Sequence, residues 1–305
     1  MNALSTTRRA ALIALPIVTL IWSYNWIVMK QVLQYSGPFE FSALRFLIGT
    51  VVLFGVMVWR REPLAPPPLL QTALLGLAQT AAFQAFVQCA LIEGAAGRTA
   101  LLAYTMPFWV VLLGWWLLAE RPSLRLWAGL LVAAAGLLLV LEPWHGQTSL
   151  RSSMLAILGG VSWAFGVVLS KRMFRRGGVS ALSLTAWQML CGAVVLVAIA
   201  LCAHERPIEW SAPFVGALVY NGILASGLAW LLWSFVVSRL PANIAGLSSL
   251  TVPIAGIALA WILLGERPSL TESLGIALIA SALAIVTRPA AGAVKRNARS
   301  PAGNS

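Results

Sequence analysis

The stretch LLAERPSL at Leu117–Leu124 recurs almost unchanged as LLGERPSL at Leu263–Leu270, 146 residues further along the chain. The two octamers differ at one position, so a chance match is improbable. The same offset pairs further residues: Pro107 with Pro253, Gly76 with Gly222 and Gly129 with Gly275. Near the start of each half, Trp22 and Lys30 recur as Trp163 and Lys171 with the same internal spacing of eight. The sequence therefore predicts a tandem duplication.

The composition predicts a membrane protein. Of the 305 residues, 60% are hydrophobic and 10% are charged, and the mean hydropathy is +0.86. In soluble domains about a quarter of the residues are charged. The much lower charged fraction of this chain excludes a water-soluble enzyme. A membrane-spanning helix takes about 20 apolar residues, so ten of them leave no room for a soluble domain.

Apolar runs bounded by charged residues, glycine and proline predict ten transmembrane helices. The first run follows Arg8 and Arg9 and passes Val28 without a small-residue cleavage site, so we expect a retained span rather than a signal peptide. The approximate limits of the spans are 10–30, 38–59, 69–92, 96–118, 124–142, 150–172, 179–203, 211–237, 241–264 and 269–288. The predicted fold class is an all-α integral membrane protein.

Each copy of the repeat holds five predicted spans, in residues 1–145 and 146–288. Because five is odd, the two copies cross the membrane in opposite directions and form an inverted repeat. In secondary transporters such a pair places the substrate site near the bilayer midplane, where the copies meet. A duplicated scaffold that transports nothing is the alternative. The remaining tail, 289–305, lacks periodicity and is expected to be disordered and cytoplasmic.

The basic residues predict the orientation. The chain has 21 Lys and Arg against nine acidic residues, for a net charge of +12. Fifteen of the 21 fall on the side of the N-terminus, five on the opposite side, and Arg45 lies within a span. Cytoplasmic loops collect positive charge, so both termini are expected in the cytoplasm. Since the basic residues are scattered between apolar runs, no nucleic-acid-binding face is expected.

No cofactor, metal or catalytic site is expected. Cys89, Cys191 and Cys202 are isolated and lack the CxxC spacing of metal or redox sites. His145 and His204 fall between apolar segments and do not form a helical zinc motif. Nucleophile-and-base pairs and glycine-rich phosphate loops are absent, so the protein is not expected to be an enzyme.

Ten helices, two five-helix halves and a GERPSL-type motif after the fourth helix of each half resemble the drug/metabolite transporter superfamily, in its EamA-type ten-helix form. The resemblance covers residues 10–288. The Trp-rich helices further resemble the bacterial branch that exports aromatic and other amino acids. This resemblance implies a bacterial inner-membrane protein whose first, third, fourth and sixth to ninth helices surround a central cavity. We expect it to act as a monomer or a weak homodimer in the lipid bilayer.

Aromatic and amide side chains within the spans are candidates for substrate binding. Trp22, Asn25 and Trp26 share one face of the first helix, and Gln84 and Gln88 stack on the third. The candidates are Trp22, Asn25, Trp26, Gln79, Phe83, Gln84, Gln88, Tyr104, Trp163, Trp187, Ser226 and Trp230. Helix packing is the alternative for each Trp, and interhelical hydrogen bonding is the alternative for each Gln.

The prolines and the charged residues add three expectations. Pro107 and Pro253 are predicted to kink the fourth helix of each half. The nine acidic residues are all Glu at or near span ends, which argues against a proton relay at mid-membrane. Arg45 is expected to snorkel or to pair with backbone carbonyls, with a substrate carboxylate as the alternative partner.

These features predict an exporter of aromatic and other neutral amino acids and related metabolites that works by alternating access. An aromatic cavity also suits organic cations, because rings attract them through cation–π contacts. An exporter of drugs or quaternary amines is therefore the nearest alternative.

Overall fold

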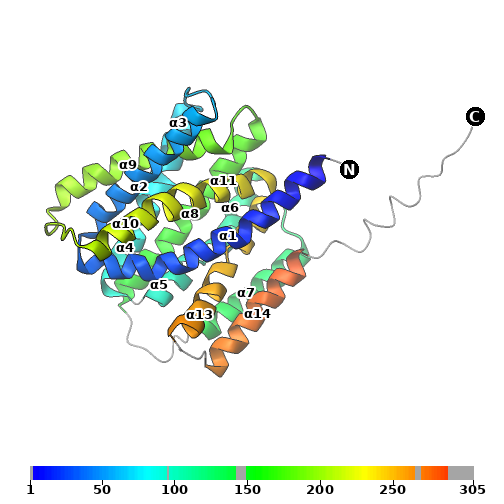
Figure 1. Ribbon diagram of the computed structural model, residues 1–305. Helices are drawn as coiled ribbons and strands as arrows, with labels where there is room; N and C mark the ends of the chain where they lie inside the picture. The colour runs from blue at the N-terminus through cyan, green and yellow to red at the C-terminus, as the bar shows by residue number, and fades with distance from the viewer. Residues whose placement is uncertain (1–2, 95, 142–148, 265–268, 288–305) are drawn as a thin grey trace, which may run out of the picture.

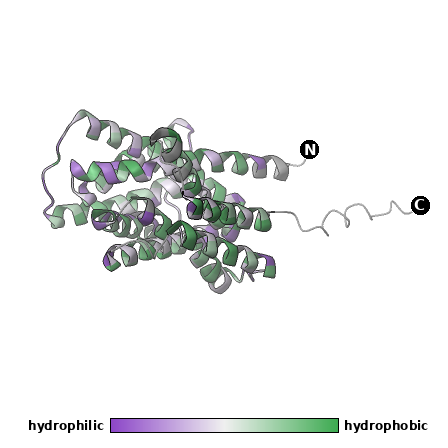
Figure 2. Ribbon diagram, turned by 90° about the horizontal axis from the view of Figure 1, so that it is seen from below, coloured by the Kyte–Doolittle hydropathy of each residue, from purple (hydrophilic) through white to green (hydrophobic). Residues whose placement is uncertain are grey.

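The computed structural model describes residues 3–94, 96–141, 149–264 and 269–287 (Figure 1). The predicted tail and residues 265–268 of the second octamer lie outside this range. The described residues form helices and connecting turns, without any strand. Hydrophobic colouring predominates along these helices in Figure 2. The prediction of an all-α integral membrane protein is confirmed.

Ten helical spans follow one another in the predicted order. Within the described ranges, eight helices are long and apolar enough to cross a membrane, and the predicted ninth and tenth spans contain the shorter apolar helices Ala242–Gly256 and Leu270–Val286. The helices are α1 (Ala3–Gln31), η1 (Val32–Gln34), α2 (Pro38–Trp59), α3 (Leu69–Leu75), η2 (Gly76–Ala82), α4 (Phe83–Glu93), α5 (Ala96–Ala103), α6 (Met106–Leu118), α7 (Leu124–Leu141), α8 (Leu150–Arg176), α9 (Ala181–Ala203), α10 (Ala212–Val219), η3 (Tyr220–Leu228), α11 (Ala229–Arg239), α12 (Ala242–Ser248), α13 (Thr251–Leu264) and α14 (Leu270–Thr287).

The third span of each half contains a π-helical segment at its centre. In the first half η2 joins α3 to α4, and in the second half η3 joins α10 to α11. The repeat offset of 146 carries η2 onto residues 222–228, which lie within η3. A π turn shifts the backbone hydrogen bonds by one residue relative to an α-helix. Such segments are frequent at functional sites.

The fourth span of each half is interrupted, not merely kinked. Tyr104 and Thr105 separate α5 from α6 just before Pro107, and Ser249 and Leu250 separate α12 from α13 just before Pro253. Proline lacks the N–H that would continue the helix, and its ring crowds the preceding turn. The breaks therefore precede the two prolines at corresponding places in the repeat.

The two halves pack against each other reciprocally. The first helix of the second half, α8, contacts α4 and α6, while the first helix of the first half, α1, contacts α11 and α13. The helices α2 and α9 pair with each other, and α7 and α14 lie side by side at one edge of the bundle (Figure 1). Each half thus supplies the partners for the other around a shared centre.

Glycines bring the two halves into close contact. A Cβ placed at Gly136 would lie 2.7 Å from the carbonyl oxygen of Gly275, and one placed at Gly275 would lie 2.6 Å from the carbonyl oxygen of Gly136. Any larger residue at these two positions would separate α7 from α14. Small residues allow this approach in membrane proteins, where packing rather than hydrophobic exclusion joins helices.

The start of α1 and the end of α14 lie toward the same end of the bundle in both views (Figures 1 and 2). A chain that crosses the membrane an even number of times has both of its ends on the same side. The arrangement agrees with ten spans rather than nine or eleven.

Candidate substrate-binding site

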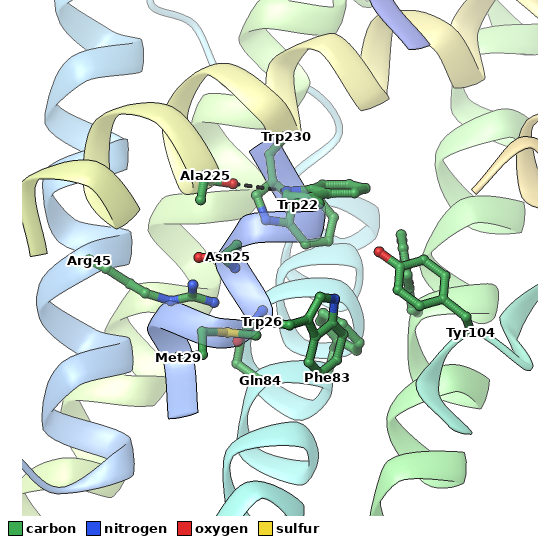
Figure 3. A pocket seen from close by; sticks show the side chains of 11 residues that line it. Trp22, Asn25, Trp26, Met29, Arg45, Phe83, Gln84, Tyr104, Ala225 and Trp230 are labelled. Atoms are coloured by element: carbon green, nitrogen blue, oxygen red, sulfur yellow. Dashed lines mark hydrogen bonds between the residues drawn. The ribbon is translucent and has the colours of Figure 1, made fainter. Parts of the chain in front are cut away.

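A small cavity lies at the centre of the bundle, between helices of both halves (Figure 3). Its volume of about 20 Å³ is enough for a single water molecule. It is lined by Trp22, Asn25, Trp26, Met29, Arg45, Phe83, Gln84, Tyr104, Trp163, Ala225 and Trp230. These residues come from the first three spans and the fourth of one half, and from the sixth and eighth spans of the other.

Aromatic rings fill one part of this centre. The centroid of the Trp163 ring lies 5.4 Å from that of Trp22, 5.2 Å from that of Phe83 and 5.5 Å from that of Tyr104. Trp22 in turn lies 5.3 Å from Trp230 in an edge-to-face arrangement. Edge-to-face pairs at these distances stabilise beyond the area they bury. The rings therefore form one continuous cluster around the cavity.

The π segments position two helices of this cluster. The Trp22 indole N–H donates to the carbonyl oxygen of Ala225 in η3, at 3.1 Å. In the other half, the hydroxyl of Ser162, which precedes Trp163 on α8, donates to the carbonyl oxygen of Ala78 in η2, at 2.8 Å. A backbone carbonyl of each π segment thus accepts a hydrogen bond from the first helix of the opposite half.

Polar atoms at the cavity remain without partners in the part of the chain that the structure describes. They are the Asn25 Oδ1, the Gln84 Oε1, the Arg45 Nε and the Trp163 Nε1. All four side chains are buried. An unsatisfied buried polar atom costs about 1–3 kcal/mol, and such atoms need an explanation. Their positions at the cavity leave these atoms available for hydrogen bonds to water or to a bound solute.

Eight of the twelve predicted site residues line the cavity: Trp22, Asn25, Trp26, Phe83, Gln84, Tyr104, Trp163 and Trp230. The other four are buried or half-buried elsewhere. Gln79 packs on Gly166 of α8, where a Cβ would lie 2.7 Å from the Gln79 Cβ. Gln88 lies one turn beyond Gln84 and is fully buried. Helical periodicity places a residue on a face but does not fix which neighbour covers that face.

Trp187 and Ser226 belong to interfaces with α2 instead of the cavity. The Trp187 ring lies 5.2 Å from the ring of Phe54, between α9 and α2. Ser226 faces Gly49, whose added Cβ would lie 3.1 Å from the Ser226 Cβ. Both residues therefore serve packing between the halves in this conformation.

Met29, Arg45 and Ala225 line the cavity although they were not among the predicted site residues. Met29 shares the helical face of Trp22 and Trp26, so spacing alone could have indicated it. The expectation that Arg45 snorkels to the membrane surface or pairs with backbone carbonyls is wrong. Its side chain is 2% exposed and donates to the side-chain oxygen of Asn221 at 2.7 Å. Trp233 also joins the ring cluster, 5.6 Å from Trp163.

Within the described ranges, no group of three His, Cys, Asp or Glu side chains could hold a metal ion. The lining of the cavity offers aromatic walls, amides and one guanidinium, groups that can bind and orient a solute.

Comparison with curated proteins identifies several transporters of similar length. The chain is 28% identical over 268 residues to the uncharacterized transporter YoaV of Bacillus subtilis, covering 86% of this chain and 91% of that one. It is also 28% identical to proteins named probable amino-acid metabolite efflux pump, from Salmonella typhimurium and Escherichia coli. Each of these two comparisons covers 92% of this chain and 95% of the other.

A solved crystal structure has the same fold. It superposes with a TM-score of 0.76 at 24% identity, covering 96% of this chain and 99% of that one. The sequence also matches the EamA-like transporter family over residues 9–142 and 150–288, which together make up nearly the whole chain. The chain is thus a multi-pass membrane transporter that belongs to the EamA-like transporter family.

Proposed function

We propose that the protein exports neutral amino acids, aromatic ones among them, and related metabolites by alternating access. The central cavity carries this proposal, because aromatic rings there surround amide and indole atoms that lack partners among the described residues. Apolar walls with a few placed polar groups are the usual composition of a small-molecule site. The efflux pumps with 28% identity support the same substrate class.

Alternating access explains why the cavity is so small. A space of about 20 Å³ holds one water molecule, so an amino acid enters only when the helices around it move apart. The interrupted fourth and ninth spans and the two π segments are the places where helices can bend without breaking a regular hydrogen-bond ladder.

Solute counterflow in proteoliposomes tests the proposal. We expect vesicles loaded with phenylalanine to accumulate labelled phenylalanine and tryptophan, and threonine to a smaller extent. Counterflow of ethidium alone would assign the transporter to organic cations, which the aromatic rings could hold through cation–π contacts. Vesicles that exchange none of these solutes would contradict transport and favour a scaffold.

The proposal includes the inner membrane of a bacterium, with both termini in the cytoplasm. The distribution of basic residues and the bacterial relatives support it. In a variant without native cysteines, an impermeant thiol reagent added to intact cells should leave Ser300→Cys unmodified. The same reagent should modify Glu209→Cys in the exposed loop before α10. Modification of Ser300→Cys but not of Glu209→Cys would show that the protein has the opposite orientation.

A further inference from the structure

Arg45 is a buried cation without a carboxylate partner. Its side chain is 2% exposed, and no ion pair of the described residues includes it. The guanidinium has five N–H donors, but the structure gives it one hydrogen bond, from Nη1 to Asn221, and leaves Nε unpartnered. A cation inside a membrane protein is expensive unless it is paired, and such residues mark substrate or ion pathways.

Neighbouring rings give the guanidinium only partial compensation. Its central carbon lies 4.6 Å from the Phe46 ring centroid and 5.7 Å from the Phe41 ring centroid. Both rings belong to α2, the helix that carries Arg45. Cation–π contacts of this kind help a desolvated cation but do not bind its N–H groups. The donors therefore remain available to an acceptor in the cavity.

The other half of the repeat shows that the fold does not need a charge at this place. Gly49 and Gly192 correspond: their added Cβ atoms would lie 3.2 Å from the Gly222 oxygen and 2.7 Å from the Gly76 oxygen. Four residues before them stand Arg45 and Gln188. Gln188 is neutral and accepts a hydrogen bond from Thr80 in η2, at 3.3 Å.

A neutral amide is thus enough to join α9 to the π segment of the other half. On α2 the corresponding hydrogen bond, from Arg45 to Asn221 in η3, comes from a positively charged side chain that lines the cavity. This difference between two corresponding joints points to a role for the charge beyond packing.

Figure 3 shows the Arg45 side chain reaching from α2 toward Asn25 and Met29 on α1, with Phe83, Trp26 and Tyr104 on the far side. The cavity therefore has a cationic end and an aromatic end. Between them the unpartnered Asn25 and Gln84 oxygens can accept hydrogen bonds from an ammonium group. No acidic side chain lines the cavity.

We infer that Arg45 binds the carboxylate of the transported solute and makes the site selective for aromatic or apolar carboxylates over organic cations. This inference rests on the proposed function and specifies its substrate class. A planar guanidinium pairs with a carboxylate through two parallel hydrogen bonds. The ammonium group of a solute meets only neutral acceptors in the cavity. A solute that carries both an ammonium and a carboxylate therefore binds, whereas a solute with an ammonium alone binds weakly.

Three ligands with the same ring and chain length test the inference: phenylalanine, 3-phenylpropionate and 2-phenylethylamine. Binding to the purified full chain is measured by calorimetry and by the rise in thermal unfolding midpoint. We expect the wild type to bind both carboxylates at least about tenfold more tightly than the amine, from the usual strength of a charge-assisted hydrogen bond.

Arg45→Gln introduces the residue type that the other half uses at the corresponding joint, so it keeps a partner for Asn221 while removing the charge. It should weaken both carboxylates roughly tenfold or more and leave the amine unchanged. Arg45→Lys keeps the charge without the planar fork and should give intermediate affinities. Gln188→Leu is the matched control. It removes the corresponding hydrogen bond with Thr80 and should leave the preference for carboxylates unaltered.

The assignment would be overturned by a wild type that binds the amine as tightly as phenylpropionate, or by equal weakening of all three ligands in both Arg45→Gln and Gln188→Leu. Equal stabilisation by chloride would overturn it in favour of a simple anion site. A wild type that transports the amine but neither carboxylate refutes the role of Arg45 and leaves a transporter. If it binds no carboxylate and moves no solute, both proposals are wrong.

Discussion

Trp163 lies at the centre of the ring cluster and differs from its counterpart in one hydrogen bond. Its side chain is 1% exposed, and its ring contacts those of Trp22 and Phe83. The Trp22 N–H donates to Ala225, whereas the Trp163 N–H has no acceptor in the part of the chain that is described. The two repeat-related tryptophans are therefore not equivalent, and only Trp163 has a free donor for a solute.

Replacing Trp163 by alanine should reduce transport of tryptophan more than transport of threonine. A large aromatic solute loses stacking area, while a small aliphatic one loses little. The two uptake rates are measured at equal membrane expression, because truncating a packed tryptophan also destabilises by about 3–5 kcal/mol. Trp116→Ala serves as the control, since that ring is 81% exposed. Equal losses for both solutes would assign Trp163 to packing alone.

At the scale of helices, the glycine at the start of η2 explains how a π segment is held against its neighbour. A Cβ at Gly76 would overlap the backbone carbonyl of Gln188 on α9 and lie 2.9 Å from the Gly192 nitrogen. Backbone atoms cannot move aside as a flexible side chain can. The close approach of η2 to α9 therefore requires glycine at position 76.

We expect Gly76→Ala to destabilise the protein by about 1–3 kcal/mol, the usual effect of overpacking. Gly216→Ala is the matched control, because an added Cβ there meets nothing within 4 Å. Alanine in that exposed turn of α10 should be neutral or stabilise by up to about 1 kcal/mol. The midpoint of thermal unfolding in detergent compares them. A smaller loss at Gly76 than at Gly216 would contradict the close contact.

Sequence reasoning predicted helices well and their interruptions only in part. The ten spans follow from long apolar runs, and the breaks near Pro107 and Pro253 follow from proline chemistry. The π segments could not be predicted, because a π turn changes the register of hydrogen bonds without changing composition. The repeat paired Gly76 with Gly222, but only coordinates show what these glycines contact.

The residues of the cavity were likewise predictable where a local sequence pattern places them and unpredictable where tertiary contacts do. Periodicity placed Trp22, Asn25 and Trp26 on one face, and they line the cavity together. Arg45 is predicted from the sequence to snorkel or to pair with backbone carbonyls, with a substrate carboxylate as the alternative, because a long side chain on a single helix can reach polar surroundings. Its burial depends on contacts with η3, which no local pattern encodes.

At the scale of the whole molecule, transport without a proton gradient is expected. The described carboxylates occupy span ends or loops, and none lines the central cavity. A proton-coupled carrier normally uses an acidic group or histidine within the membrane. Phenylalanine movement in proteoliposomes should therefore follow its own gradient and persist after an uncoupler is added. Strict dependence on an imposed pH gradient would show this expectation to be wrong.

Two lysines at opposite ends of the bundle make equivalent hydrogen bonds to backbone carbonyls. Lys30 Nζ on α1 donates to the carbonyl oxygens of Leu91 and Gly94, at 2.5 Å and 3.0 Å. Lys171 Nζ on α8 donates to those of Val237 and Leu240, at 3.0 Å and 2.7 Å. The offset of 146 relates the two acceptor pairs. In each half, a lysine of the first span thus holds the C-terminal end of the third, where a cation is favourable.

In the predicted inverted repeat, the two sets of lysine hydrogen bonds lie on opposite sides of the membrane, and we expect each to control access from its own side. Lys30→Met removes charge-assisted bonds worth about 1.5–3 kcal/mol each, which favours opening at the outer end. The rate at which an impermeant thiol reagent modifies Ala225→Cys should then rise roughly tenfold from outside and not from inside. Lys171→Met should produce the reverse in inside-out vesicles.

Arg151→Met provides the control for this last experiment. Arg151 contacts Glu93 at 3.2 Å near the same end of α4, but the pair is exposed and contributes little to stability. Its loss should leave modification of Ala225→Cys unchanged from either side. If Lys30→Met and Lys171→Met both accelerate modification from the same side, the two joints do not act as a symmetric pair. In that event the centre is held closed by other contacts between the halves, among them the aromatic cluster.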